Sequence, residues 1–397
     1  MKKTILSFAL FCLPSVLTFG QNVVKTMLRL PDTGQTSNFT ASQGEDADYN
    51  IFTPYFLING NGSVTDTVTG LMWQQTDGGE MTIENALNYC DTLTLGGYSD
   101  WRLPNAHEAF SILNHNYSNP ALNLTVFAPT NAEYWWTSNR QANDNTKIWV
   151  TNAGGGIGNH QKLETISAGG TKRFHVRAVR DIYAPTAAIP HFIDHGNNTI
   201  TDQLTGLVWQ KVPLNDTLTW EQSLQYAENL SLAGKSDWRL PNIKELQSLN
   251  DENLVNPSIN TLFFSAIGLK KYWSSTSLPN QTVQAWYLDT RFGITTHDVK
   301  TKSINLLCVR GPETGNIVGA TAPKQPTIGR VFPNPFSSHI YLEQNTEEAY
   351  FELLNTSGTL FFAGNDLQNQ DFTNIPAGIY WLKIFNAQPR TILLIKE

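Results

Sequence analysis

Three basic side chains at alternate positions, Arg173, His175 and Arg177, are the chain's most suggestive ligand-binding pattern. Alternate residues of a β-strand point to the same face, so we expect the three side chains to form one positive strip. A positive strip could bind an anionic polysaccharide. The same spacing is also typical of a solvated strand face that binds nothing, and the sequence leaves both interpretations open.

Trp136 is the second candidate, as a platform on which a sugar ring could stack. It directly follows Trp135, and neighbouring residues of a strand face opposite ways, so we expect one indole to point inward and the other outward. Trp136 aligns with Ser274 when the two halves of the chain are compared. The alternative is a place in the core, because a buried Trp contributes a large apolar area.

The hexamer Asp-Trp-Arg-Leu-Pro-Asn occurs twice, at Asp100–Asn105 and at Asp237–Asn242. Its acid and arginine, with a glutamate three residues further on, could form an acid–base constellation. Neither copy adds a shared Ser, Cys or His that could act with them. We therefore interpret the charged pair as a local ion pair or backbone clamp. The predicted structural residues are Asp100, Trp101, Arg102, Asp237, Trp238 and Arg239.

The repeated hexamer aligns two halves of the chain and brings further residues into register. The segment from Asp66 to Gln74 aligns with the one from Asp202 to Gln210. The remaining matches, in chain order, are Tyr134-Trp135 with Tyr272-Trp273, Trp149 with Trp286, and Val179-Arg180 with Val309-Arg310. The chain is therefore a tandem duplication of one domain, large enough to bury its own core.

Each repeat contains signals for both helices and strands. A hairpin signal opens the repeat, and a helix is expected to start at Thr82, with apolar residues at helical spacing behind it. A second helix should follow the hexamer, where Asn105 and Glu108 have capping-box spacing. The rest of the repeat is aromatic, broken by Gly and β-like. These patterns predict an α+β fold.

The chain divides into six segments by composition. Met1-Lys2-Lys3 before an apolar run is typical of a secretory signal peptide, and the run is too short to span a membrane. A stretch rich in Pro, Gly and Thr after the second repeat indicates a flexible linker. The expected segments are a signal peptide, 1–20; a polar lead, 21–54; repeat one, 55–183; repeat two, 191–311; a linker, 312–327; and a C-terminal unit, 328–397.

Charge and residue spacing narrow the possible partners. The net charge is −7 and only 15% of the residues are charged, which argues against nucleic acid, since phosphate binding needs a basic face. No group of His, Cys and carboxylates has metal-ligand spacing, so no metal or cofactor is expected. Calcium remains open, because carbonyl and carboxylate sites are poorly visible in sequence. No transmembrane segment is expected.

Two cysteines, Cys90 and Cys308, remain after the expected signal peptide. Cys90 lies on the apolar face of the first expected helix, where repeat two has Ala227. Cys308 lies near the end of repeat two, where repeat one has Ala178. Either each cysteine is a buried free thiol, or the two form a disulfide across the repeats, which would require an intimate interface.

Both repeats resemble the Lcl C-terminal domain family. The resemblance rests on Asp-x-x-Thr-Gly-Leu-x-Trp, the hexamer followed by Glu, Tyr-Trp and a closing Val-Arg, and it covers about residues 55–311. It implies two tandem C-type-lectin-like domains that bind ligands at the cell surface and are not enzymes. The family's named member binds sulfated glycosaminoglycans. Many members carry both cysteines in one repeat, whereas this chain splits the pair.

The C-terminal unit resembles the type A sorting domain of the type IX secretion system. The resemblance rests on Pro333-Asn334-Pro335 and on an alternating strand that begins after Pro376-Ala377-Gly378. It implies a small immunoglobulin-like sandwich that takes the protein to the outer-membrane translocon as its partner. An adhesive immunoglobulin-like domain is the alternative.

These observations together predict a secreted or surface-attached binding and adhesion protein. The expected ligand is a glycan or another envelope component. One alternative is a structural envelope or matrix protein without a soluble ligand. Another is an oxidoreductase like the formylglycine-generating enzymes, which share the lectin-like relationship but need reactive cysteines. A single cysteine in each repeat, one of them on an apolar helix face, argues against that chemistry.

Overall fold

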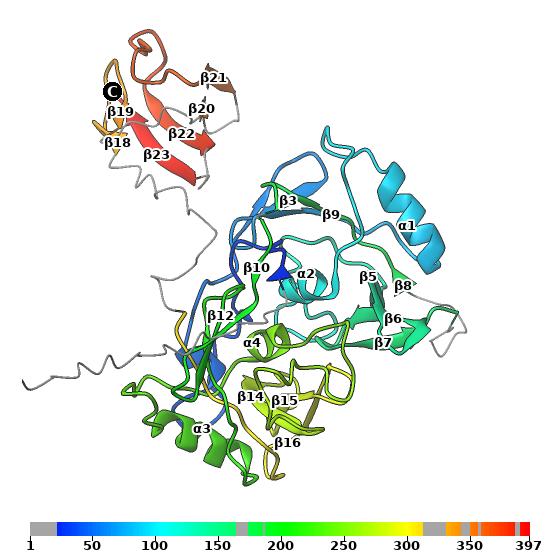
Figure 1. Ribbon diagram of the computed structural model, residues 1–397. Coiled ribbons are helices and arrows are strands. Elements are labelled where there is room, and N and C mark those ends of the chain that lie inside the picture. The colour runs from blue at the N-terminus through cyan, green and yellow to red at the C-terminus, as the bar shows by residue number, and fades with distance from the viewer. Residues whose placement is uncertain are drawn as a thin grey trace, which may run out of the picture.

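The structure, a computed structural model, describes residues 22–163, 174–185, 187–312, 331–342, 350–355, 359–385 and 390–397 (Figure 1). The expected signal peptide, 1–20, and all but the first residue of the expected linker, 312–327, lie outside this range. Within it, two repeats with matching element order are followed by a C-terminal unit of strands.

Repeat one contains two four-stranded sheets and two helices. The first sheet is antiparallel, in the order β2 (Phe56–Ile58), β3 (Ser63–Asp66), β4 (Leu71–Gln74) and β9 (Val179–Asp181). The second has the order β7 (Ile157–Gln161), β6 (Asp144–Asn152), β5 (Tyr134–Gln141) and β8 (Phe174–His175). The helices α1 (Ile83–Thr92) and α2 (Ala106–Ser111) lie between them in sequence. The closing strand β9 returns beside β4, so both ends of the repeat share one sheet.

Repeat two has the same element order, except that its described residues form no strand in the place of β8. Its first sheet runs β11 (Phe192–Asp194), β12 (Thr199–Asp202), β13 (Val208–Gln210) and β17 (Val309–Arg310). Its second runs β14 (Lys271–Ser277), β15 (Gln284–Asp289) and β16 (Ile294–Val299). The helices are α3 (Trp220–Glu228) and α4 (Ile243–Ser248). Strands predominate over helices in both repeats, which confirms the expected α+β class at this coarse level.

The short helices after the hexamer begin where the capping-box spacing predicts. The Asn105 side chain accepts a hydrogen bond from the Glu108 N–H at 2.8 Å, and the Glu108 carboxylate accepts one from the Asn105 N–H at 2.9 Å. Asn242 and Glu245 repeat both bonds at 2.9 Å. Each box satisfies N–H groups that have no partner inside the helix. The cap therefore fixes where α2 and α4 start.

The hydrophobic core is continuous across the two repeats. Repeat one has one cluster around Trp73, Phe127 and Trp149, and a second around Trp136 and Phe174. The first of these clusters also takes in side chains of repeat two, namely Ile243, Leu278 and Trp286. Because apolar area is buried in this shared cluster, separating the repeats would expose it to water.

The polar lead lies between the two repeats as an integral layer (Figure 1). It begins with β1 (Asn22–Val23), which pairs with β10 (Ile189–Pro190), and includes the short 3-10 helix η1 (Asp46–Asp48). The buried Gln35 side chain donates to the carbonyls of His115 at 3.2 Å and Ser277 at 3.0 Å, and accepts from the Ser277 N–H at 3.1 Å. One lead side chain thus joins both repeats.

Equivalent positions on α2 and α4 reach across the junction in opposite directions. His107 of repeat one contacts the carbonyl of Asn250 at 3.1 Å and the carboxylate of Glu252 at 3.1 Å in repeat two. Lys244 of repeat two donates to the carbonyl of Ser111 in repeat one at 2.7 Å, and to a lead carbonyl. Burial lowers the pKa of Lys244 to about 8.

The C-terminal unit consists of strands throughout its described residues. A pair, β18 (Val331–Phe332) and β19 (Tyr341–Leu342), accompanies a sheet in the order β21 (Leu360–Gly364), β20 (Tyr350–Asn355), β22 (Gly378–Phe385) and β23 (Arg390–Lys396). Side chains from both groups of strands enclose one apolar cluster that includes Phe336, Phe351 and Leu382.

The His107–Glu252 contact predicts a pH-dependent stability. Burial lowers the pKa of His107, but the charge and hydrogen bond of Glu252 outweigh it and raise the pKa to about 9 from 6.5. The ion pair should therefore stabilise the fold fully below pH 6.5 and lose its contribution as the pH rises through 9. We expect the advantage over His107→Gln, up to about 3 kcal/mol, to vanish across that window in urea unfolding experiments.

Glu252→Gln is the matched control, since it removes the charge that raises the histidine pKa while keeping the shape of the side chain. In that background, His107→Gln should show little dependence on pH between 6.5 and 9. An advantage for wild type that stays constant from pH 6 to 10 would contradict a charged His107.

Candidate functional site

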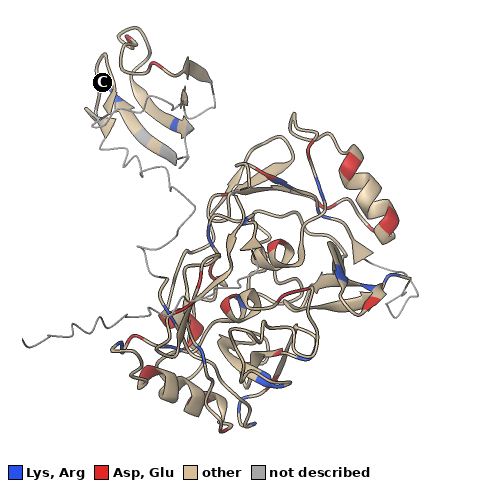
Figure 2. Cartoon of the chain, viewed as in Figure 1, with Lys and Arg blue, Asp and Glu red and all other residues tan. Residues whose placement is uncertain are grey.

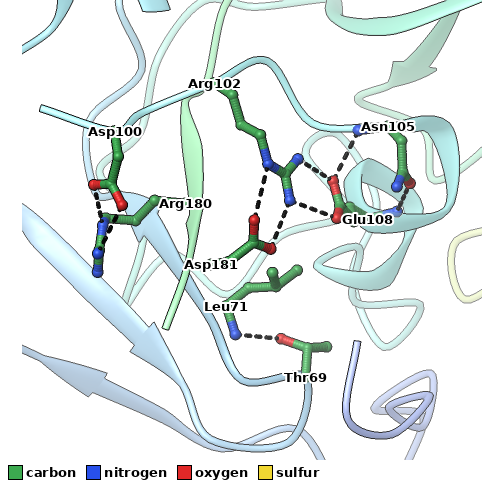
Figure 3. A network of polar contacts seen from close by, with 8 residues as sticks. All are labelled: Thr69, Leu71, Asp100, Arg102, Asn105, Glu108, Arg180 and Asp181. Atoms are coloured by element: carbon green, nitrogen blue, oxygen red, sulfur yellow. Dashed lines mark hydrogen bonds and ion pairs between the residues drawn. The ribbon is translucent and has the colours of Figure 1, made fainter. Parts of the chain in front are cut away.

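The hexamer of repeat one takes part in two groups of charged contacts, one around Arg102 and one between Asp100 and Arg180 (Figure 3). The Arg102 guanidinium donates to both carboxylate oxygens of Glu108, at 2.7 and 2.8 Å, and to Asp181 at 2.8 and 3.3 Å. Asp100 accepts two hydrogen bonds from Arg180, at 2.7 and 2.9 Å. These bonds tie the hexamer to the cap of α2 on one side and to the closing strand β9 on the other.

Repeat two builds the same clamp in a more buried setting. Arg239 donates to both oxygens of Glu245 at 2.6 Å, and to the carbonyl of Gly311 at 3.2 Å. Asp237 pairs with Arg310 at 2.7 and 3.0 Å. The Arg239 side chain is 4% exposed, whereas that of Arg102 is 33% exposed. The charged atoms are used for joining elements, which places the hexamer in the scaffold in both copies.

The hexamer tryptophans serve the same scaffold. The Trp101 indole N–H donates to the carbonyl of Leu95 at 3.1 Å, and Trp238 donates to the carbonyl of Leu232 at 3.2 Å. Both rings are buried. Each indole thus has its one hydrogen-bond partner inside its own repeat.

Trp136 lies in the core, which differs from the expectation of an outward sugar platform. Its side chain is 1% exposed and stacks on Phe174 with ring centroids 4.3 Å apart. Its indole N–H donates to the carbonyl of Met81 at 2.9 Å. A ring covered on its face and paired at its only donor cannot stack on a sugar.

The strand register explains why Trp136 seemed specific to repeat one. Trp136 pairs with Val150 in β6, and Trp273 pairs with Tyr287 at the matching place in β15. Trp273 donates its indole N–H to the carbonyl of Leu218 at 3.3 Å, as Trp136 does to Met81. The structural counterpart of Trp136 is therefore Trp273. The alignment of Tyr134-Trp135 with Tyr272-Trp273 is shifted from this register by one residue, so it places Trp136 opposite Ser274. A slip of one residue reverses every side chain of a strand.

The predicted basic strip is turned inward. Arg173 lies outside the described residues. His175 and Arg177 share a face as their spacing predicts, but both are buried, at 3% and 2% exposure. The reason is Asp77, whose carboxylate lies 2.9 Å from His175 Nδ1 and 3.7 Å from Arg177. The two described residues of the strip, His175 and Arg177, therefore offer no exposed surface to a polysaccharide.

The inward charges are specific to repeat one and mutually compensated. Burial opposes ionisation of Asp77, but the hydrogen bond from His175 and the charge of Arg177 outweigh it and hold its pKa at about 2. Arg177 also donates to the carbonyls of Gln74 at 2.8 Å and Gln75 at 2.6 Å. A buried charge persists only with such partners, so the group is a structural network.

The glycine run after β6, Gly154–Gly156, is a contact between the repeats. His115 lies 2.9 Å from the carbonyl of Gly155, whose φ of +103° favours glycine. The Ile157 N–H donates to the Thr295 hydroxyl of repeat two at 2.9 Å. A Cβ on Gly156 would lie 3.3 Å from the Trp286 ring, so the close approach of the repeats requires a small residue.

Cys90 and Cys308 are free thiols, which excludes the proposed cross-repeat disulfide in this structure. Each is fully buried in the apolar cluster of its own repeat, Cys90 near Ala178 and Cys308 near Ala227. Burial raises the pKa of Cys90 to about 12 and that of Cys308 further. Thiols held in the neutral form are poor nucleophiles.

A groove of about 50 Å³ opens in repeat one between α1 and the second sheet. Its lining combines apolar and charged side chains: Ile83, Glu84, Leu87, Ser138, Arg140, Ile148 and Lys162. Leu87 has the helical spacing of the buried residues Ile83 and Cys90 but is itself 39% exposed at the groove. The equivalent Leu224 in repeat two is fully buried.

The same place in repeat two is filled by Trp220, which stands where repeat one has Ile83 at the start of the helix. Trp220 is fully buried, donates its N–H to the carbonyl of Ser274 at 2.7 Å, and lies 3.8 Å below the Lys300 ammonium. Ile148 pairs with Arg140 in repeat one, and Ala285 pairs with Ser277 at the equivalent place in repeat two. Ala285 is therefore the counterpart of Ile148 on the neighbouring strand. A large and a small residue have thus exchanged places. This reciprocal change is visible in the sequence once the register is known.

A second hollow, the junction cavity, measures about 140 Å³ and lies where the lead meets both repeats. Its lining consists of Val24, Lys25, Thr26, Met27, Arg29, Leu30, Asn105, His107, His191, Leu204, Thr205 and Ser248. The sequence signal for it is weak, because its charged residues belong to the lead and to the ends of different elements. Along both repeats as a whole, Lys and Arg are interspersed with Asp and Glu (Figure 2).

Neither hollow holds a set of residues for covalent chemistry. Within the described residues, no group of three or more His, Cys, Asp or Glu could hold a metal ion. In the same range, no helix is long and apolar enough to cross a membrane. What the groove and the junction cavity can offer is non-covalent binding through apolar faces and cations.

The difference in burial between the two clamps predicts unequal costs of removing their arginines. Arg239→Met should lower the free energy of unfolding by about 3–5 kcal/mol, because it leaves Glu245 buried without its partner. Arg102→Met should cost clearly less, since water can reach Glu108 and Asp181 through the place of the exposed guanidinium. Urea unfolding of the two variants measures both values. Equal losses would contradict this assignment.

A thiol assay tests whether Cys90 and Cys308 are free and buried. Ellman's reagent should find no reactive thiol in the native protein and two after denaturation without reductant. A denatured protein with no free thiol would mean that Cys90 and Cys308 are oxidised in the exported protein.

Comparisons with known proteins agree with the geometry. Residues 62–180 and 198–310 each match the Lcl C-terminal domain, and residues 330–395 match the secretion system C-terminal sorting domain. The comparison with curated proteins found no match. The chain therefore belongs to the Lcl C-terminal domain family, with two tandem copies followed by a type IX sorting domain that directs its export to the cell surface or the extracellular space.

Proposed function

We propose that this exported protein is a binding and adhesion protein that recognises a glycan through C-type-lectin-like repeats, and that it is not an enzyme. The family and the sorting domain support a role outside the cell. Against an oxidoreductase of the formylglycine-generating type stand the two thiols, which are buried, separate and held neutral. The sorting domain, proposed as an immunoglobulin-like sandwich, supplies the contact with the type IX machinery.

One observation carries the glycan assignment: a groove opens in repeat one beside Ile83, at the position where repeat two has the fully buried Trp220. In the second copy a flat ring, that of Trp220, lies under the Lys300 ammonium. In repeat one Ile83 is smaller than Trp220 while Ile148 is larger than Ala285, and the groove that remains has Lys162 at its edge, 3.6 Å from Glu84. A ring-shaped ligand would occupy the position of the missing indole.

The lining suits one sugar ring. A pyranose has an apolar face of C–H groups and a rim of hydroxyls, so it needs apolar contact on one side and polar partners at the edge. Ile83, Leu87 and Ile148 supply the apolar contact. Arg140 and Lys162 supply donors. Because Glu84 pairs with Lys162, the charge of Arg140 is the one that favours a sugar with a carboxylate or sulfate group.

A paired substitution tests the groove directly. Ile83→Trp together with Ile148→Ala reproduces the combination of repeat two, so the new indole fills the groove without crowding the strand. We expect the double variant to fold and to lose at least ten-fold in affinity for whichever ligand the wild-type protein selects from an array of neutral, uronic and sulfated glycans. Arg140→Ala should weaken an acidic ligand and reduce the salt dependence of its binding.

Arg291→Ala is the control, because it removes an exposed cation from repeat two, outside the groove. It should bind as wild type does. If no glycan binds the wild-type protein, with or without calcium, the lectin assignment fails and a structural envelope or matrix role takes its place. If a glycan binds equally to the filled double variant, recognition lies elsewhere on the repeats.

A further inference from the structure

The junction cavity contains a cation that the fold does not use. Lys25 lines the cavity and is 7% exposed, and among the described residues it makes no hydrogen bond and no ion pair. Burial lowers the pKa of this lysine more than the charge of Asp202 raises it, and the charge of Arg29 lowers it further. A buried ammonium without a partner is costly, and an anion beside it would offset that cost.

The other ionisable residues that line the cavity are also basic. Arg29 is held against the ring of Phe52, with its guanidinium carbon 4.9 Å from the ring centroid. His107 is charged at neutral pH through its contact with repeat two. His191 has a buried Nε2 without a hydrogen bond. The cavity thus presents several positive or donor groups to one space.

Two nearby carboxylates, those of Asp202 and Glu252, contact histidines of the lining, and the charge of Asp202 also attracts Lys25. Asp202 accepts hydrogen bonds from the Leu204 N–H at 2.9 Å and the Thr205 hydroxyl at 2.7 Å, within its own turn. Its Oδ1 lies 3.4 Å from His191. Glu252 is bound to His107 and to the Asn250 amide. Neither acid is part of the lining, so the wall of the cavity remains positive.

The size and the remaining lining define the class of ligand. A volume of about 140 Å³ is close to the ~150 Å³ that admits a benzene molecule in an engineered protein cavity. Met27, Leu30 and Leu204 supply apolar contacts on its walls. The cavity therefore suits a ligand that has one ring and one anionic group.

We propose that the junction cavity binds a small organic anion, with its carboxylate or sulfate group on Lys25 and its ring against Met27 and Leu204. This site is separate from the groove of repeat one, since it is built from the lead, α2 and repeat two. The anion could arrive as a free aromatic acid or as an acidic sugar, and the two sources share the same recognition by Lys25.

Calorimetric titration of the full exported protein distinguishes these sources. Benzoate represents the free aromatic acid, glucuronate the acidic sugar, and benzyl alcohol a neutral ligand with the ring of benzoate. We expect at least one of the two carboxylates to bind, and benzyl alcohol to bind at least ten-fold more weakly than benzoate if benzoate is the ligand. Absence of binding by both carboxylates overturns the proposal.

Two variants locate the binding. Lys25→Met keeps the length and apolar stem of the side chain but removes its charge, and should weaken the bound carboxylate at least ten-fold. Leu204→Trp fills the cavity and should abolish binding even though Lys25 is intact. Lys235→Met, on an exposed turn of repeat two, is the matched control and should bind as wild type does.

Thermal unfolding keeps the test decisive if a variant is damaged. A ligand that binds only the folded state raises the unfolding temperature, so the wild-type protein should gain stability with the carboxylate and the Lys25→Met protein should not. Undiminished binding by a folded Lys25→Met protein overturns the proposal. The filled Ile83→Trp, Ile148→Ala protein should still bind the carboxylate, which separates this site from the groove.

Discussion

The two repeats form one body because buried polar groups of the lead are satisfied only when both repeats are present. Gln35 uses both ends of its amide on carbonyl and N–H groups of the two repeats. One carboxylate oxygen of Asp46, Oδ2, is also buried and accepts hydrogen bonds from Thr33 at 2.8 Å and from Thr276 of repeat two at 2.5 Å, whereas Oδ1 has no hydrogen-bond partner among the described residues. Loss of either partner would leave a polar group unpaired in the interior, which is more costly than the bond is worth. Placement of the junction cavity and of the α2–α4 contact follows from this constraint.

Duplication supplied two copies of one scaffold, which then diverged in opposite ways. The clamp around the hexamer is retained in both copies, but repeat one closes it with Asp181 and repeat two with a backbone carbonyl. Repeat one buries a charged network around Asp77. In repeat two, Asn305 and Leu307 stand at the positions of His175 and Arg177. Repeat two fills with an indole the groove that repeat one leaves open. Comparing the copies therefore separates what the fold needs from what one copy has gained.

The sequence was sufficient where the signal was local or repeated. The hexamer, the two capping boxes and the domain order could be predicted because each depends on residues a few positions apart or on an intact duplication. Trp136 was misassigned because Tyr-Trp aligns with Tyr-Trp, whereas the hydrogen-bonded ladder pairs Trp136 with the place of Trp273. Alternation correctly put His175 and Arg177 on one face, but only Asp77, distant in sequence, decides that this face is inward. The role of the lead was hidden for the same reason.

The contacts of Gln35 also bear on the order in which the protein can fold. Its partner Ser277 is 242 residues away along the chain, so the first part of the lead to be synthesised is among the last to find its place. Contacts of such long range close large loops and are typical of slow folding. Until repeat two has formed, the lead has no complete set of partners, and repeat one remains unsealed along its junction face.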